Sequence, residues 1–524
     1  MDRGRRGQRP AFAADLRSRV PARIQALPST QTFDVLVLGS QLAGAVAGAL
    51  LARRGYRVIA IEHTPLASVY MEDDFRLPFG PTVMPQLRHL PSALAIFEEL
   101  GVGAEMARAS RAITGIQILS ERARLDLFPD EPRRQSEIRR EFGADPSSIS
   151  KAIDALILRE EQNAPFFAGQ LPMPAEGILN RLRLRRAAHG LQIGEAAELV
   201  NPPAHPLALG LKELWRLSNN LVEQESLPEP NVVDQPARAA LRPLAQWLRG
   251  LSRFSGGEAG LAALLHKRIE SSGGAVLSGE GAIVEELVVE HGRITALKLL
   301  DSQNHYRAHM VVAALDSLAL RELVPVNLRK RRQLQALDAV RIRSQLVTLN
   351  LVVRAGGLPP GLGEAAVGVP GGRSRSFFLQ VSPAERIRGV TDPPEKLVTL
   401  AMQVPPQSFA GGAESVRKLL QELRAGAECF LPFLARHVVL ESSPQLSARA
   451  AAANERRLHP RLEIARPRQL GVSGLSPRSV LKNVVLANQE VLPGLGLEGQ
   501  FLAGLSAASL IQKLMKKSDP LARR

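Results

Sequence analysis

The apolar residues near the start of the chain predict a strand–helix–strand unit. Residues 33–38 form a nearly continuous run of apolar and β-branched side chains, which is typical of a strand covered on both faces in a parallel sheet. Small and apolar residues at helical spacing follow as far as Arg54, and Gly55 then predicts the end of the helix. Residues 56–62 predict the second strand.

Further along the chain, helical and strand patterns alternate. Residues 133–250 contain several amphipathic stretches separated by Pro and Gly, which predict a helical insertion. Gly292 separates two short β-rich runs and predicts a hairpin within residues 275–300. The predicted helices include residues 87–100, 149–159, 241–251, 414–425 and 427–436, and the other predicted strands include 310–314, 345–353 and 397–403.

The turn between the first strand and the first helix is rich in glycine. It runs Gly39-Ser-Gln-Leu-Ala-Gly44, and Glu62 ends the second strand. In a dinucleotide-binding fold the first glycine permits the tight turn, the last permits close helix packing, and the helix N-terminus offers free N–H groups to pyrophosphate. A carboxylate about 20 residues on accepts the ribose hydroxyls. The predicted contacts to the adenosine diphosphate part of a dinucleotide are Gly39, Gln41, Leu42, Ala43, Gly44 and Glu62.

Gln41 departs from this pattern, which has a glycine at the middle position so that the backbone can approach pyrophosphate. The added side chain either turns aside, hydrogen-bonds phosphate or blocks the site, and the sequence leaves these three outcomes open. The alternative for the whole segment is a strand–helix–strand unit that keeps its packing and binds no nucleotide.

A second glycine-rich turn lies near the C-terminus. Residues 483–504 predict a strand, then Pro-Gly-Leu-Gly-Leu-Glu-Gly, then a helix. The candidate contacts Gly494, Gly496 and Gly499 permit close approach of the backbone to a ligand, and the N-terminus of the new helix faces an electron-rich oxygen. A glycine-rich loop before a terminal helix also occurs as an ordinary turn, which is the alternative here.

These turns and two intervening segments together resemble the phytoene desaturase-like FAD-dependent oxidoreductases, relatives of the flavin amine oxidases. Residues 75–82 resemble the family's segment that ends in Gly-Pro-Thr near the flavin, and residues 255–261 resemble its Gly-Gly turn before a helix. The resemblance implies FAD as cofactor, and it places Val284 where the family has a valine that touches adenine. It also implies hydride transfer to flavin from an apolar, isoprenoid-like or carotenoid-like substrate.

Three positions depart from the family. Residues 64–70 replace its Gly-Gly-Arg motif, Asn488 replaces a glycine, and Leu492 replaces a histidine. A noncatalytic binding protein that keeps the fold without FAD is therefore one alternative function, and an amine or amino-acid oxidase is another. No catalytic side chain and no metal site is predicted. The nearby polar residues His63, His89, His266 and Asp316 are expected to have hydrogen-bonded structural roles.

The predicted fold class is α/β, with a Rossmann-like FAD/NAD(P)-binding domain that is discontinuous in sequence and a second, helix-rich α+β substrate domain. Residues 1–32 predict a flexible basic tail. The predicted FAD-binding domain comprises residues 33–105, 252–330 and 468–517, and the predicted substrate domain comprises residues 106–251 and 331–467.

Composition narrows the partners. The net charge is +16, but the basic residues are scattered and only 4% of residues are aromatic, which argues against specific nucleic-acid binding and suits attraction to anionic lipid. No segment reaches the about 18 apolar residues that span a bilayer, so the prediction is a cytoplasmic protein that is either soluble or peripherally associated with a membrane. The single cysteine, Cys429, excludes an intrachain disulfide and is expected to be a small buried side chain.

Overall fold

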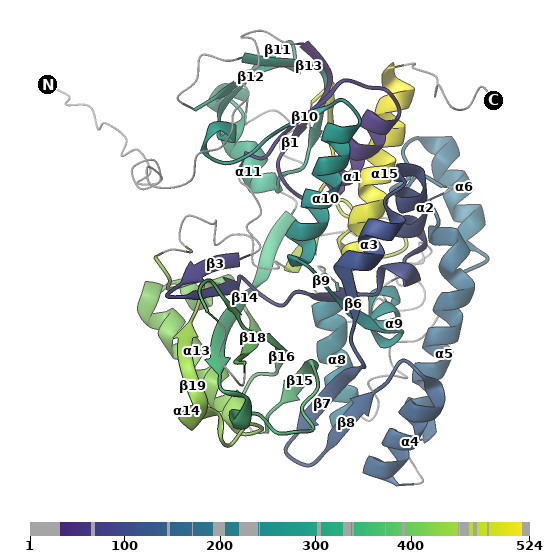
Figure 1. Ribbon diagram of the computed structural model, residues 1–524. Coiled ribbons are helices and arrows are strands. Elements are labelled where there is room, and N and C mark those ends of the chain that lie inside the picture. The colour runs from purple at the N-terminus through teal and green to yellow at the C-terminus, as the bar shows by residue number, and fades with distance from the viewer. Residues whose placement is uncertain are drawn as a thin grey trace, which may run out of the picture.

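The structure of the chain is a computed structural model. It describes residues 32–63, 69–143, 147–169, 171–191, 205–219, 239, 241–300, 305–328, 337, 340–371, 374–389, 394–448, 450, 461–464, 469–478 and 481–515. Two large sheets and the helices around them make up most of these residues (Figure 1).

The first sheet is seven-stranded and mainly parallel. Its strands are β1 (Thr32–Leu38), β2 (Val58–Ile61), β10 (Ala275–Leu277), β11 (Val284–Glu290), β12 (Arg293–Leu299), β13 (His305–Ala313) and β21 (Val484–Leu486). The order is β10-β2-β1-β13-β12-β11, and β21 also pairs with β13. Leu38 lies opposite both Ile61 and Ala313, so three strands end at one edge. Strands from distant parts of the sequence share this sheet, which confirms the predicted Rossmann-like fold class.

The second sheet is eight-stranded. Its strands are β7 (Ile116–Ser120), β8 (Arg124–Leu127), β14 (Val340–Val353), β15 (Ala365–Val369), β16 (Phe377–Pro383), β18 (Lys396–Val404), β19 (Val438–Ser442) and β20 (Arg461–Ile464). The order is β19-β14-β18-β16-β15-β7-β8, and β20 also pairs with β14. There are also two three-stranded sheets, with the orders β17-β4-β3 and β5-β9-β6. They consist of β3 (Val69–Glu72), β4 (Phe75–Pro78), β17 (Glu385–Arg386), β5 (Val83–Pro85), β6 (Ser110–Ala112) and β9 (Leu251–Phe254).

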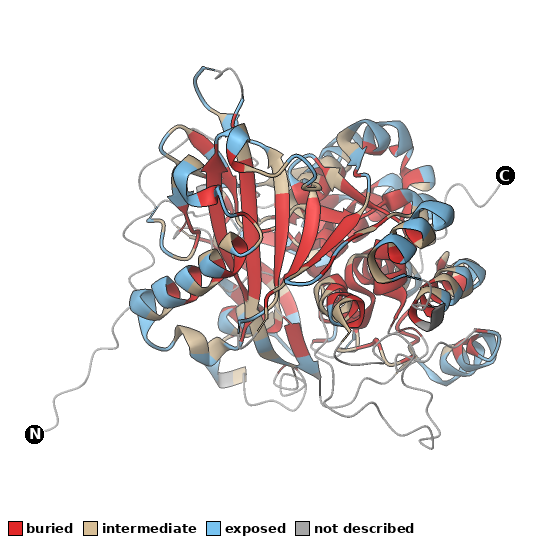
Figure 2. Ribbon diagram, turned by 90° about the horizontal axis from the view of Figure 1, so that it is seen from below, coloured by how far each residue is buried: buried red, intermediate tan, exposed pale blue. Residues whose placement is uncertain are grey.

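Helices surround the sheets, and their outer faces are exposed while the strands are buried (Figure 2). They include α1 (Leu42–Arg53), α2 (Pro91–Leu100), α3 (Gly103–Ala109), α4 (Glu131–Phe142), α5 (Ser147–Asn163), α6 (Ile178–Ala188), α8 (Pro206–Ser218), α9 (Arg242–Leu248), α10 (Gly257–Ser271), α11 (Ser317–Leu323), α13 (Gly412–Glu428), α14 (Leu434–His437) and α15 (Gly496–Met515). On β18, Leu400 belongs to the same hydrophobic cluster as α13, and the next residue, Ala401, belongs to the same cluster as α8, because successive strand residues point to opposite faces. Within the described part of the chain, no helix is both long and apolar enough to cross a membrane.

Helix α1 is buried on every side between the first sheet, α10 and α15. Residues 42–52 of this helix are all buried, as expected for a helix without a polar face. Its small residues permit close packing. A Cβ at Gly48 would lie 2.8 Å from Cδ1 of Ile269 on α10, and a Cβ at Gly504 on α15 would lie 2.5 Å from the carbonyl oxygen of Ala43. Figure 1 shows α1 beside both helices.

Two predictions about residues 427–436 are wrong. The expected continuous helix is interrupted: α13 ends at Glu428 and α14 begins at Leu434. Pro432 explains the gap, because proline donates no N–H and disfavours helical geometry in the preceding residue. Cys429, expected to be buried, is exposed at the C-terminal end of α13. Its apolar neighbours in sequence face the second sheet, but Cys429 lies on the other side of the amphipathic helix.

Candidate functional site

The two glycine-rich turns, which are far apart in sequence, meet beyond the end of the first sheet. The first follows β1 and the second follows β21, and β13 lies between these two strands. The backbone N–H of Gln489 donates a 3.0 Å hydrogen bond to Oε1 of the Gln41 side chain. The residue that departs from the glycine pattern therefore bridges the two turns.

The glycines of the first turn are needed for packing. Gly39 has a φ of +108°, and a Cβ there would lie 2.4 Å from the carbonyl oxygen of Ala314. At Gly44 a Cβ would lie 2.1 Å from the Cβ of the same alanine. No side chain caps α1, and no acidic residue lies in its first turn. Leu42 and Ala43 thus begin a helix whose N-terminus carries no compensating negative charge.

The predicted adenosine contacts have partners within the chain. Oε1 of Glu62 lies 2.7 Å from Nδ1 of His266 on α10. The backbone N–H of Val284 donates a 2.9 Å hydrogen bond to Nδ1 of His63. The departure from Gly-Gly-Arg falls mostly on residues 64–68, which lie outside the described residues.

The glycines of the second turn also lie against backbone of this chain. The N–H of Gly494 donates to the carbonyl oxygen of Val472 at 3.1 Å. A Cβ at Gly496 would lie 2.3 Å from the carbonyl oxygen of Ser218, and a Cβ at Gly499 would lie 2.2 Å from that of Leu492. Close backbone packing is therefore a sufficient reason for Gly496 and Gly499.

The buried carboxyl group of Glu490 lies shortly after strand β21. Glu490 accepts hydrogen bonds from the backbone N–H of Ser317, at 3.0 Å to Oε2, and from the hydroxyl of the same residue. Asn488, which replaces the family's glycine, donates to the carbonyl oxygen of Leu315 at 2.7 Å. Burial raises the pKa of Glu490 to about 7, although the hydrogen bonds from Ser317 oppose the shift. Asp316 caps α11 by accepting the N–H of Ala319 at 2.8 Å.

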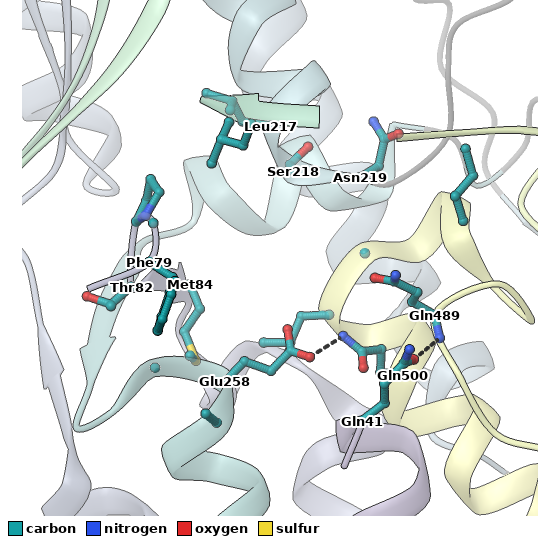
Figure 3. Close-up of a pocket in the computed structure, with 18 of the residues that line it drawn as sticks. Gln41, Phe79, Thr82, Met84, Leu217, Ser218, Asn219, Glu258, Gln489 and Gln500 are labelled. Carbon is teal, nitrogen blue, oxygen red and sulfur yellow. Dashed lines mark hydrogen bonds between the residues drawn. The ribbon is translucent and has the colours of Figure 1, made fainter. Parts of the chain in front are cut away.

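A cavity of about 240 Å³ opens beside the second turn. Its walls are largely apolar and include Phe79, Trp247 and Phe378. Nε2 of Gln500 on α15 donates a 2.9 Å hydrogen bond to Oε1 of Glu258 on α10, and both side chains face the cavity (Figure 3). Burial raises the pKa of Glu258. The buried Oε1 of Gln500 has no hydrogen-bond partner among the residues that the structure describes.

The predicted contacts are divided between two places. Gln41 and Gly496 line the cavity, as does Gln489. Its described lining does not include the other predicted contacts, namely Gly39, Leu42, Ala43, Gly44, Glu62, Val284, Gly494 and Gly499. The cavity therefore lies at one end of the row of predicted contacts, on the side of Gly496, and the remaining predicted contacts lie outside it.

A buried ion cluster at the start of α15 was not predicted from the sequence. Arg242 is 1% exposed, and its guanidinium contacts the carboxylates of Glu498, 3.1 Å from Nη2 to Oε1, and Glu160, 3.1 Å from Nη1 to Oε2. Gln246 donates to the same Glu498 at 2.6 Å. Burial alone lowers the pKa of Arg242, but the two carboxylates outweigh it and raise the pKa. The described residues contain no group of three or more His, Cys, Asp or Glu that could hold a metal ion.

Glu258 was also missed, although it carried a signal. It interrupts the glycine-rich segment 255–260 with a carboxylate at the start of a helix. Its partner Gln500 carried none, because a single glutamine in a terminal helix is ordinary.

Comparison with known proteins identifies the fold. No family model matches the chain, and no curated protein sequence matches it. An oxidoreductase from Methanosarcina mazei matches with a TM-score of 0.53 and 14% identity, over 93% of this chain and 100% of that one. Cyclohexylamine oxidase from Brevibacterium oxydans matches with a TM-score of 0.52 and 15% identity, over 93% and 100%. A putrescine oxidase variant from a redesign of cofactor binding gives 0.54 and 13%, over 93% and 100%.

At these identities the matches show a shared fold. They cover nearly all of this chain and the whole of each oxidase, so both large sheets belong to the shared architecture. The chain therefore has the fold of oxidoreductases that include amine oxidases. A shared fold of this kind does not determine the reaction, which depends on the residues of the site.

Proposed function

We propose that the chain is an FAD-dependent oxidoreductase of the phytoene desaturase-like type, acting on an apolar small molecule by hydride transfer to flavin. One observation carries the proposal. Two glycine turns distant in sequence meet at one edge of a parallel sheet, within a hydrogen bond of each other at Gln41 and Gln489. In open parallel sheets, ligands bind beyond the carboxyl ends of the strands, where these turns lie.

The backbone along this edge suits an elongated dinucleotide. Leu42 and Ala43 would present the first N–H groups of the uncapped helix α1 to the pyrophosphate. Glu62 would accept the ribose hydroxyls, and Val284 would meet the adenine. Gly496 would bring the N-terminus of α15 to the flavin end, beside the cavity.

Two side chains of this chain already bond backbone N–H groups along the path proposed for FAD. Gln41 accepts the N–H of Gln489, and His63 accepts the N–H of Val284. A hydrogen bond of this kind contributes about 0.5–1.5 kcal/mol net, so releasing both costs about 1–3 kcal/mol. Both side chains are only partly buried. The residues present therefore fit FAD after Gln41 and His63 turn aside, with a corresponding loss of affinity.

The flavin would supply the hydride acceptor when bound. The chain's own residues would position the substrate and keep it dry. The rings of Phe79, Trp247 and Phe378 offer apolar contact area to a hydrocarbon, and Met84 and Leu217 extend it. These walls would exclude water from the reacting carbon, which limits competing reactions.

A second candidate function is binding without catalysis, in a protein that keeps the fold and holds no FAD. The contact between Gln41 and Gln489 favours it, because the bridge lies between the two turns where the phosphates would pass. The cavity would then be the whole ligand site, and Glu62 and Val284 would have only structural roles.

A third candidate, an amine or amino-acid oxidase, is favoured by the carboxyl groups of the cavity. Three carboxylic acids, Glu258, Asp316 and Glu490, line the cavity, and no Lys, Arg or His is among its described lining residues. Burial raises the pKa of Glu258 and Glu490, which favours their uncharged forms, so a cationic substrate would have to bring these carboxyl groups into the charged form on binding. Peroxide release with amine substrates would support this candidate.

The visible absorption spectrum of the purified full-length chain tests the first two candidates. The first predicts the absorption bands of an oxidised flavin and, after denaturation, about one FAD per chain by mass spectrometry. If the protein is colourless and takes up no FAD during dialysis against an excess of the cofactor, the oxidoreductase proposal is wrong and the binding protein stands.

A further inference from the structure

Helix α6 exposes large apolar side chains beside arginines. Ile178 is 79% exposed, Leu179 is 74% exposed and Leu182 is 46% exposed. The same helix contains Arg181, Arg183, Arg185 and Arg186, all exposed, and its sequence includes no acidic residue. Leaving three large apolar side chains in water on one short helix is unfavourable, so the surface calls for an explanation.

Helical spacing places these side chains on one face. Residues 178, 182 and 186 are separated by four positions, and 179 and 183 are also four apart, so they are neighbours on the helix surface. Leu184 and Ala188, again four apart, are the buried residues of α6 and define the opposite side, which packs into the hydrophobic core. The outward face therefore combines Ile178, Leu179 and Leu182 with Arg183 and Arg186.

We propose that this face of α6 docks on the surface of an anionic membrane. An interfacial helix buries its apolar side chains at the boundary between headgroups and acyl chains, while arginines extend to the lipid phosphates. Charge complementarity selects lipid over a neutral apolar partner, because the exposed charges of α6 are all positive and the whole chain carries +16. The described helices offer no membrane-spanning alternative.

The depth of binding follows from the geometry of the helix. α6 has eleven residues, and its inner side is fixed to the core through Leu184 and Ala188. The helix thus lies along the membrane plane and inserts only its outward side chains. Binding then depends on two contributions, apolar burial from Leu179 and its neighbours and attraction between arginines and anionic lipid.

Vesicle co-sedimentation of the full-length protein separates the two contributions. We expect binding to phosphatidylcholine vesicles that contain phosphatidylglycerol, and weak binding to phosphatidylcholine alone. Leu179→Asn should weaken binding to the anionic vesicles at least about fivefold, through lost apolar burial. The double variant Arg183→Gln/Arg186→Gln should weaken it about 20-fold or more, at about fivefold for each arginine, and added salt should have a similar effect.

Val326→Asn is the matched control. Val326 is 72% exposed, as far as Leu179, but it lies outside α6. This variant should bind anionic vesicles as the unaltered protein does. Circular dichroism and thermal melting of all variants should match, since the substituted side chains point into solvent.

Three results would each overturn the proposal. One is failure of the unaltered protein to bind anionic vesicles, and another is equal binding by Leu179→Asn. The third is a concentration-dependent dimer that Leu179→Asn dissociates, without any vesicle binding, because the face would then be a contact between two copies. The flavin content of the protein does not enter this test, so its outcome is independent of the oxidoreductase proposal.

Discussion

The two ends of the candidate site differ in how their polar groups are satisfied. At the closed end, Gln41, Glu62 and the backbone of Val284 all contact groups of this chain. At the cavity end, Glu258 and Gln500 bond each other, and Oε1 of Gln500 is left without a partner among the described residues.

At the closed end, Nε2 of His266, the residue that contacts Glu62, is also buried without a hydrogen-bond partner among the described residues, so neither end has all of its polar groups satisfied. Buried polar groups in folded proteins are nearly always hydrogen-bonded, so a buried acceptor left open indicates a missing donor. The closed end differs in that side chains of this chain already bond the backbone N–H groups of Gln489 and Val284. The cavity end is finished by something that donates a hydrogen bond, whether a substrate, a cofactor or ordered water.

The largest expected effect concerns the buried ion cluster of Arg242, Glu498 and Glu160 beside the cavity. Glu498→Ala removes a fully buried carboxylate and leaves Arg242 with one acidic partner, Glu160, instead of two. Because Glu160 still balances the charge of Arg242, the loss comes from the hydrogen bonds that Arg242 and Gln246 donate to Glu498. At about 1.5–3 kcal/mol for a hydrogen bond to a charged group, the free energy of unfolding in urea should fall by about 3–5 kcal/mol. Glu498→Gln keeps side-chain oxygen as an acceptor and should lose less. Equal stability of Glu498→Ala and the unaltered protein would mean that the cluster does not hold α15 in place.

Glu490 shares one property with each end. It lines the cavity, but its carboxyl group already accepts a hydrogen bond from the backbone N–H of Ser317. Its pKa of about 7 in the folded protein is above the ordinary value of 4.5 for a glutamate side chain. The folded state therefore binds this proton more tightly, so the stabilisation is present below pH 4.5 and is lost as the pH rises through 7. Relative to Glu490→Gln, we expect a loss of roughly 3 kcal/mol between pH 4.5 and 7.5.

Urea denaturation of both proteins across this range measures the slope. The glutamine amide is uncharged and nearly the same size, so the variant removes the titration with little change in packing. Parallel pH profiles for the two proteins would show that Glu490 titrates normally and belongs with solvated groups.

The smallest expected effect comes from removing the Gln41 side chain at the closed end. Gln41→Gly removes the bridge to Gln489 and restores the glycine of the dinucleotide pattern. One net hydrogen bond of about 0.5–1.5 kcal/mol corresponds to FAD affinity about 2- to 13-fold higher, measured by equilibrium dialysis. Gln41→Leu is the matched control, because it loses the hydrogen bond but keeps the bulk, and it should gain less. Unchanged or weaker FAD binding by Gln41→Gly would mean that the bridge does not close the site.

Local patterns were sufficient to predict much of the first sheet. The apolar run at 33–38 is β1, and the glycine turn leads directly into α1. The hairpin around Gly292 is the pair β11–β12, with a φ of +77° at that glycine. Each of these depends on neighbours within a few residues, which is the range over which periodicity and turn chemistry act. The predicted boundaries of the two domains remain predictions.

Contacts between distant residues could not be predicted in this way. The sequence suggested that the two glycine turns converge only through the resemblance to a family, and it left the direction of the Gln41 side chain open. The cluster of Arg242 and Glu498 joins residues that no local pattern connects. At Cys429 the local pattern misled, because an apolar string can sit at the end of an amphipathic helix with one member facing solvent.

The position of β21 in the first sheet bears on synthesis by the ribosome. β1 is synthesised before its neighbour β13, which follows hundreds of residues later, and β21 follows later still. At about 5–20 residues per second, the apolar strand β1 waits on the order of tens of seconds before this sheet is complete. Unpaired apolar strands are prone to aggregate, so we expect co-expression with chaperones to raise the yield of this protein.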